Sequence, residues 1–175
     1  MPSPKLTIPV AAIHEASHAA LAVLLGIPFD KVELRFDVDG ALVGGGLDYG
    51  HHHQGLFEQS RATPSVAKYW LVVIVGGEVG HRNLARQHND AWSAADRVDA
   101  HKLVLPLLAP FIDHADDAPD PFDQDRLGEA WLLEVARERA KEMLAENEDA
   151  VRRLAKALEL RHSLSHQGIL DLLDI

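Results

Sequence analysis

The stretch from Pro9 to Gly26 constrains the fold of this chain more than any other, because it is apolar almost throughout. Pro9 suits the first position of a helix, and Gly26 suits the residue that follows its end. A helix that is apolar on every side is stable only when other elements cover it. Three ionisable residues, His14, Glu15 and His18, lie inside this stretch. Burying them is costly unless each is paired or bound to a metal ion.

These three residues form an H-E-x-x-H motif. Residues four apart lie one turn apart on the same face of a helix, so the imidazoles of His14 and His18 can reach one metal ion. Glu15 borders that face and can take a proton from a water at the metal. Zinc suits two imidazoles and a carboxylate, with an open fourth position. The alternative interpretation of the same residues is a hydrogen-bonded polar cluster.

A zinc site of this kind needs a third protein ligand. Metzincins place a histidine six residues after the second motif histidine, and this chain has Leu24 there, which excludes that pattern. A second helix can supply the ligand instead, and the candidates are Glu78 and Asp96, with Asp99 as a further one a turn along. Ser93-x-x-Asp96 is also a capping-box pattern, in which Asp96 only caps its helix.

The rest of the chain predicts a single domain, residues 1–175, that is mainly α with a small β-sheet (α+β). Strands are expected at 31–36 and 41–43, followed by a loop rich in glycine and histidine at 44–59. Helices are expected at 10–26, for about twenty residues from 64, and from 93 toward 106. Further helices are expected from 120–121, with a continuation or restart near 147, and at 165–173. The proline-rich segment 106–123 is expected to be an irregular connection or short broken helices.

Composition excludes several classes of function. The chain contains no cysteine, which excludes disulfides, thiolate zinc sites and cysteine nucleophiles. A net charge of −10 argues against a broad basic surface and against nucleic acid as a partner. No apolar run is long enough to span a bilayer. Residues 19–29 resemble the apolar part of a signal peptide, but cleavage there would remove the motif, so we expect a cytoplasmic protein.

The motifs and their order resemble peptidase family M41, the protease domain of the FtsH-type ATP-dependent zinc metalloproteases. Four segments carry the resemblance: 11–27 (AAIHEASHAALAVLLGI), 31–36 (KVELRF), 74–78 (IVGGE) and 93–98 (SAADRV). The resemblance extends in the same order over nearly the whole chain, including the C-terminal helices. It implies a zincin-like helical domain in which the H-E-x-x-H helix carries the site.

The resemblance also implies roles for individual residues. His14, His18 and Asp96 would bind zinc (Zn²⁺), and Glu15 would be the catalytic base. Glu78 matches the acid of the family's middle helix and is expected to orient a ligand histidine. The implied activity is zinc-dependent hydrolysis of peptide bonds in unfolded proteins or peptides. Because the family commonly forms rings, we expect a homo-oligomer.

This chain departs from the family at three points. Ser17 stands where the family usually has glycine, and Ala95 replaces the usual asparagine before Asp96. No G-x-x-x-x-G-K-[ST] loop occurs in the sequence, so action is expected on unfolded chains without ATP, or together with a separate ATPase. The first alternative function is a non-catalytic metal-binding module that acts through protein partners. The second is a helical interaction protein in which the motif is accidental.

The remaining histidines have simpler interpretations. His51, His52 and His53 follow one another, and three successive side chains in an extended segment cannot all face one ion. We therefore expect a solvated loop there rather than a second metal site. His81 and His88 are expected on the surface of the helix that contains Glu78 or close to it.

Overall fold

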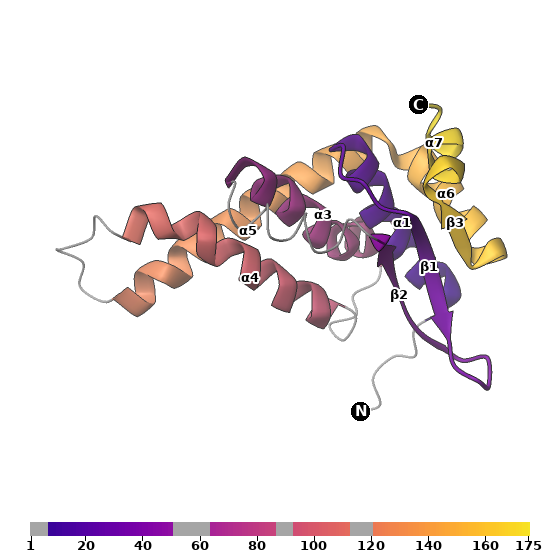
Figure 1. Ribbon diagram of the computed structural model, residues 1–175, viewed down its shortest axis with the longest axis horizontal. Helices are drawn as coiled ribbons and strands as arrows, with labels where there is room; N and C mark the ends of the chain where they lie inside the picture. The colour runs from indigo at the N-terminus through magenta and orange to yellow at the C-terminus, as the bar shows by residue number, and fades with distance from the viewer. Residues whose placement is uncertain (1–6, 51–63, 87–92, 113–120) are drawn as a thin grey trace.

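The computed structural model describes residues 7–50, 64–86, 93–112 and 121–175. In these ranges it has six helices and a three-stranded antiparallel sheet, which confirms a mainly helical chain with a small sheet (Figure 1). The helices are α1 (Ile8–Leu24), α3 (Pro64–Asn83), α4 (Ser93–Ile112), α5 (Pro121–Glu146), α6 (Glu148–Arg161) and α7 (His166–Leu173). None of these helices has the length and hydropathy that a membrane span requires.

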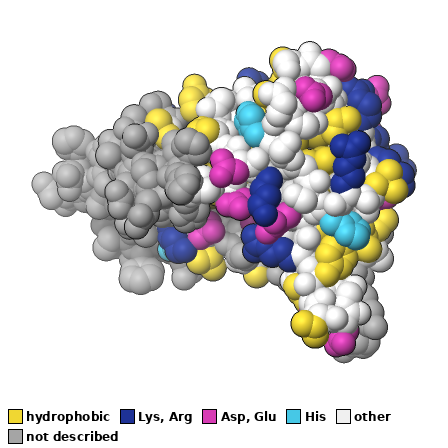
Figure 2. Space-filling model, turned by 45° about the vertical axis from the view of Figure 1, so that its right-hand side comes forward, with side chains coloured by type: hydrophobic (Ala, Val, Ile, Leu, Met, Phe, Trp, Pro, Cys, Tyr) yellow, Lys and Arg dark blue, Asp and Glu magenta, His cyan; other side chains and the backbone are white. Residues whose placement is uncertain are grey.

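Helix α1 is the central element, with α3 and α6 packed against it and the sheet alongside (Figure 1). Its residues from 10 to 22 are buried except for Ile13, as expected for a helix that is apolar on every side. The motif residues are therefore inside the protein. Acidic and basic side chains are intermixed on the face of the molecule that Figure 2 shows, with no single-sign patch there.

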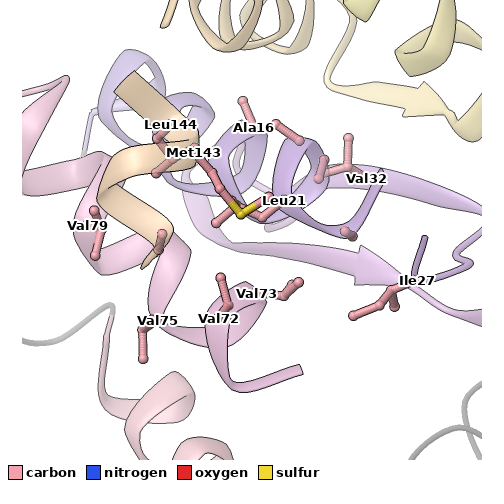
Figure 3. Close-up of a cluster of buried hydrophobic side chains, with 14 of the residues drawn as sticks. Ala16, Leu21, Ile27, Val32, Val72, Val73, Val75, Val79, Met143 and Leu144 are labelled. Carbon is pink, nitrogen blue, oxygen red and sulfur yellow. The ribbon is translucent and has the colours of Figure 1, made fainter. Parts of the chain in front are cut away.

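Helix α3 approaches α1 closely because small residues face it. A Cβ at Gly76 would collide with the side chain of Leu21, and a Cβ at Gly80 would collide with that of Ser17. The hydroxyl of Ser17 donates to the carbonyl of Ile13 at 2.7 Å, so its polar group is satisfied within α1. Figure 3 shows the buried apolar cluster beside this contact, to which α5 adds further side chains. The serine that departs from the family pattern thus fits against a glycine of α3.

The sheet has the order β2-β1-β3, with β1 (Lys31–Phe36) in the middle and antiparallel to both neighbours. The bounds of β1 confirm the strand predicted at 31–36. β2 (Leu42–Asp48) is longer than predicted, because 44–48 was expected to be loop. Glycines weaken a strand on average, but the missing side chain of Gly45 lets this one lie against a buried group of α1. The short strand β3 (Ser163–Ser165) was not predicted.

The expected helices are present, with differences at their ends. α1 begins and ends two residues earlier than the predicted 10–26. α4 continues through Pro106 to residue 112, so the prediction of an irregular segment is wrong for 106–112. A proline removes one helical hydrogen bond, and the helix on both sides of it can persist at a cost in stability. α5 begins at Pro121, as predicted. Of the two alternatives near Asn147, the structure has the restart, as α6. α7 begins one residue later than the predicted 165–173, with Ser165 as its N-cap.

Candidate metal centre

Helices α1 and α4 bring His14, His18 and Asp96 together. The two Nε2 atoms are 3.1 Å apart, and Oδ2 of Asp96 lies 3.1 Å from Nε2 of His14 and 3.5 Å from Nε2 of His18. A tetrahedral zinc ion with bonds of about 2.0–2.1 Å needs ligand atoms about 3.3 Å apart. The three side chains are largely buried, and together they could hold a metal ion.

A backbone group of α3 orients His18. Its Nδ1 lies 2.7 Å from the carbonyl oxygen of Val73. A carbonyl can only accept, so Nδ1 carries the hydrogen and Nε2 faces the other side chains of the cluster. This is the kind of outer contact that fixes the orientation of a metal-binding imidazole. The sequence holds no signal for it, because the acceptor belongs to the main chain.

The same face of α3 continues with Gly77 and His81, each four residues further along. A Cβ at Gly77 would collide with Nε2 of His18 and lie 2.6 Å from Nε2 of His14, so only glycine leaves room for the two imidazoles. His81 is buried, and its ring is perpendicular to that of His14 at 6.1 Å between centroids. The expectation that His81 lies on the helix surface is therefore wrong.

Glu15 lies beside the cluster and is 3% exposed. Its carboxylate is covered by β2, where a Cβ at Gly45 would lie 2.5 Å from Oε1. Oε2 accepts no hydrogen bond from any described residue. Burial raises the pKa of Glu15 to about 7 with a contribution from Asp96, although His18 and Arg35 act in the opposite direction. A carboxylate with such a pKa can accept and release a proton near neutral pH.

Of the three candidate ligands, His18 is the one that carries an additional proton at neutral pH. Burial lowers the pKa of His14 to about 4, so this imidazole is neutral. Burial opposes a charge on His18 as well, but Asp96 and Glu15 outweigh it and raise its pKa to about 9. Burial alone would raise the pKa of Asp96, whereas the contacts with His18 and His14 lower it below its ordinary value. The result is an ionised carboxylate next to one charged and one neutral imidazole.

Tyr49 follows β2 and completes the polar surroundings of the site. Its ring packs on that of Trp70 in α3, with centroids 4.8 Å apart. Burial raises the pKa of Tyr49, and the charges of Glu15, Asp96 and Asp99 raise it further. The phenol therefore stays protonated and can donate a hydrogen bond. Nothing in the local sequence marks Tyr49, because no pattern indicates that the end of β2 meets α3.

The other acidic candidates have different partners. Glu78 is buried, but its carboxylate lies 2.7 Å from Arg82 and 3.5 Å from Arg137. It therefore faces α5. The expectation that Glu78 orients a ligand histidine is wrong. Asp99 forms an exposed ion pair with Lys102 at 2.7 Å. Of the three acids considered as the third ligand, Asp96 is the one that lies at the histidine pair.

Some sequence-based interpretations cannot be compared with the structure. Asp96 lies in the first turn of α4, as the capping-box pattern expects, but the side chain of Ser93 lies outside the described part. The histidines at 51–53 and His88 also lie outside the described residues.

The donor set and its surroundings fit a metal ion. Two imidazoles and a carboxylate are typical ligands of zinc and other divalent metals. The gap left by Gly77 accommodates the imidazoles, and the unpartnered Oε2 of Glu15 is the kind of buried oxygen that a bound water satisfies. No protein-family model and no curated protein matches this sequence. The geometry of these residues is therefore the basis for inferring a function.

Proposed function

We propose that this chain is a zinc-dependent metallopeptidase with a zincin-like fold of the M41 type. The observation that carries the proposal is the separation of 3.1–3.5 Å between the donor atoms of His14, His18 and Asp96. Chance placement of an H-E-x-x-H motif would not bring a carboxylate from a distant helix to these distances. Glu15, buried beside the cluster, supports a catalytic role rather than a purely structural metal site.

The chain's own residues supply proton transfer and orientation. When bound, zinc acts as a Lewis acid, which polarises a peptide carbonyl and makes a water molecule more acidic. Glu15 takes the proton from the attacking water at its carboxylate and passes it to the nitrogen of the leaving amine. The Val73 carbonyl orients the imidazole of His18, and the absence of a side chain at Gly77 leaves room for both imidazoles.

The edge of the sheet supports an extended peptide as the substrate. The N–H of Leu34 donates to the carbonyl of His162 at 2.8 Å, so its backbone groups face the β3 side. Gly45 lies opposite Leu34, and its N–H and C=O therefore point away from β1. Among the described strands β2 is an edge, so an incoming segment can pair there. Such a segment would pass close to Glu15, whose carboxylate faces Gly45.

The proposed substrates are unfolded proteins and peptides, because pairing with a strand edge requires an extended backbone and no particular sequence. We further propose that attack on stably folded proteins requires a separate ATPase, since this sequence contains no nucleotide-binding loop of the G-x-x-x-x-G-K-[ST] type. We also propose that the chain forms a homo-oligomer and that it is cytoplasmic.

Cleavage of a fluorescent unfolded protein tests the function. Zinc-loaded wild type is expected to cleave it, to stop after chelation, and to resume when zinc is restored. Glu15→Gln is expected to bind zinc with unchanged stoichiometry and to lose about 10²- to 10⁴-fold in turnover, because the proton acceptor is gone. Zinc binding without cleavage by either protein would contradict the peptidase and favour a non-catalytic metal-binding module.

A further inference from the structure

The side chain of Arg35 extends from β1 onto β2, on the face of the sheet that points away from α1. In the strand register Arg35 is opposite Gly44, yet its Nη2 would lie 3.5 Å from a Cβ at Gly46. Outside the adjoining chain, no other described residue has an atom within 4 Å of that Cβ. The guanidinium therefore takes the place that a side chain at Gly46 would occupy.

The ion pairs on this face leave the outer end of Arg35 available. Glu33 accepts a hydrogen bond from Nε of Arg35 at 2.9 Å and another from Nζ of Lys31 at 2.6 Å. Glu33 thus has two cationic partners, whereas the Nη groups of Arg35 donate to none of the described residues. A guanidinium carries five N–H donors in a fork that matches a carboxylate. Arg35 can therefore bind a second carboxylate while it keeps its contact with Glu33.

A peptide paired with the free edge of β2 would place a side chain beside this guanidinium. Gly45 presents its N–H and C=O to that edge, and the next residue, Gly46, has its Cβ position on the same face as Arg35. Directly opposite residues of neighbouring strands have Cβ atoms about 4.5–5.5 Å apart. Arg35 therefore acts as the cross-strand neighbour of the peptide residue opposite Gly46, and an acidic side chain there forms a favourable pair.

The attraction is limited to one position of the peptide, because the charge changes sign along β2. Asp48 lies two residues beyond Gly46 on the same face, and its carboxylate is 3.7 Å from Nζ of Lys31. The chain as a whole has a net charge of −10. An acidic side chain opposite Asp48 meets a like charge, which is unfavourable between neighbouring strands. General attraction of acidic peptides to this protein is not expected either.

Arg35 is also close to the group proposed for proton transfer. The carboxylate of Glu15 faces Gly45 from the other side of the sheet. Burial raises the pKa of Glu15, and Arg35 is one of the charges that oppose this shift. A peptide residue opposite Gly46 is the chain neighbour of the residue opposite Gly45, which passes close to Glu15. The position beside Arg35 therefore lies near the bond that would be cleaved.

We propose that Arg35 selects an acidic side chain on the substrate residue that pairs opposite Gly46, close to the scissile bond. The substrates are then extended peptides with aspartate or glutamate at this position. The inference rests on the proposed peptidase function and on peptide pairing with β2, although peptide binding can be measured without turnover.

Binding of two blocked heptapeptides of alternating threonine and alanine, one with a central glutamate and one with a central glutamine, tests the selection. The protein is the full chain with Glu15→Gln and zinc, so that no cleavage interferes. Fluorescence anisotropy at low ionic strength is expected to show about threefold to fivefold tighter binding of the glutamate peptide. The difference should disappear in 1 M salt, where the screening length is about 3 Å. Equal affinities at low ionic strength, or binding of neither peptide, would overturn the proposal.

Two pairs of variants locate the effect. Arg35→Gln is expected to remove the preference for glutamate, whereas Arg139→Gln, which removes an exposed ion pair of α5, should keep it. Gly44→Glu retains Arg35 but supplies a carboxylate from the residue opposite it, and should also remove the preference. Gly44→Gln is the control of the same size, and a Cβ at this position would meet nothing within 4 Å. A preference that survives both Arg35→Gln and Gly44→Glu would overturn the assignment to Arg35.

Cleavage of the same peptides by zinc-loaded wild type separates the two proposals. A preference for the glutamate peptide that depends on Arg35, without cleavage of either peptide, would support a carboxylate site at Arg35 and contradict the peptidase. Cleavage of both peptides with equal kcat/KM, together with equal affinities, would support the peptidase and overturn the selection by Arg35.

Discussion

Gly77 and Glu78 are consecutive residues of α3, yet they belong to two different regions of the molecule. Successive residues of a helix point about 100° apart. Gly77 therefore faces the imidazoles of α1, whereas Glu78 faces α5 and lies 3.5 Å from Arg137. One helix thus separates the candidate metal centre from an ion cluster made by Glu78 with its two arginines.

Each region contains one buried glutamate, and the two differ in their partners. Glu15 is 3% exposed and Glu78 is 7% exposed, so their burial is similar. Both oxygens of Glu78 have an arginine within ion-pair distance, whereas Oε2 of Glu15 accepts no hydrogen bond from the described residues. A buried carboxylate with cationic partners, such as Glu78, contributes to the stability of the fold. A buried carboxylate without a hydrogen-bond donor and with a raised pKa, such as Glu15, is available for proton transfer.

The largest expected effect is on metal binding by Asp96→Ala. Removal of a direct ligand should lower zinc affinity by more than about 100-fold, since even the loss of an outer contact costs about 10- to 100-fold. Asp99→Ala, one turn along α4, is the matched control and should bind zinc like wild type. Competition with a chromogenic chelator measures both. If the two variants lose affinity equally, Asp96 is not the third ligand.

Gly77→Ala tests the face of α3 that meets the histidines. The new Cβ would displace both imidazoles, with an expected cost of about 1–3 kcal/mol in stability and a weaker zinc site. Gly44→Ala is the control, because its Cβ would meet nothing within 4 Å. Urea unfolding and zinc titration of the two variants provide the comparison. Unchanged zinc affinity in Gly77→Ala would show that the space left by Gly77 is not required for zinc binding.

Glu78→Gln tests the opposite face of α3. It leaves two arginines without their carboxylate, and we expect a loss of about 2 kcal/mol, below the roughly 3–5 kcal/mol of a fully buried pair because the arginines are partly exposed. Zinc affinity should not change. Glu138→Gln on the exposed side of α5 is the control for the same substitution. A Glu78 variant that unfolds like wild type but loses zinc would reverse the roles of the two regions.

The smallest expected effect for a single step, about tenfold for each pH unit, is the pH dependence of zinc affinity. In the metal-free site His18 holds a proton up to a pKa of about 9, because Asp96 and Glu15 outweigh its burial, and a metal ion must displace that proton. Affinity should therefore rise roughly tenfold per pH unit from about pH 6 and level off above about pH 9, with about one proton released. Calorimetry in buffers of different ionisation enthalpy measures that proton. A zinc affinity independent of pH in this range would contradict a protonated His18 in the metal-free site.

The elements with strong sequence signals were predictable. The apolar patterns and proline positions predicted α1 and α3, and the alternation of 31–36 predicted β1. The periodicity also predicted the helical segments on both sides of Asn147, but it left open whether the helix continues or restarts there. The glycine-rich end of β2 was not predictable, because the close packing of Gly45 against Glu15 is a tertiary contact that no local pattern shows. The three residues of β3 are too few to form a pattern, and they pair only because β1 is already in place.

The same difference applies to the candidate site. The motif spacing and the family resemblance pointed to His14, His18 and Asp96, which the structure brings together. The surrounding contacts of Val73, Gly77 and Tyr49 depend on how α3 and β2 pack, and no local pattern marks them. Glu78 was misjudged because its partner Arg137 lies on a different helix, although its other partner, Arg82, lies four residues further along α3.

We propose that Glu15 transfers protons in catalysis, whereas Glu78 stabilises the fold. The most direct test is cleavage of an unfolded fluorescent protein by zinc-loaded Glu15→Gln and Glu78→Gln at a temperature where both are folded. Glu15→Gln is expected to lose about 10²- to 10⁴-fold in turnover, whereas Glu78→Gln is expected to stay close to wild type. Cleavage by Glu15→Gln at the wild-type rate would contradict it.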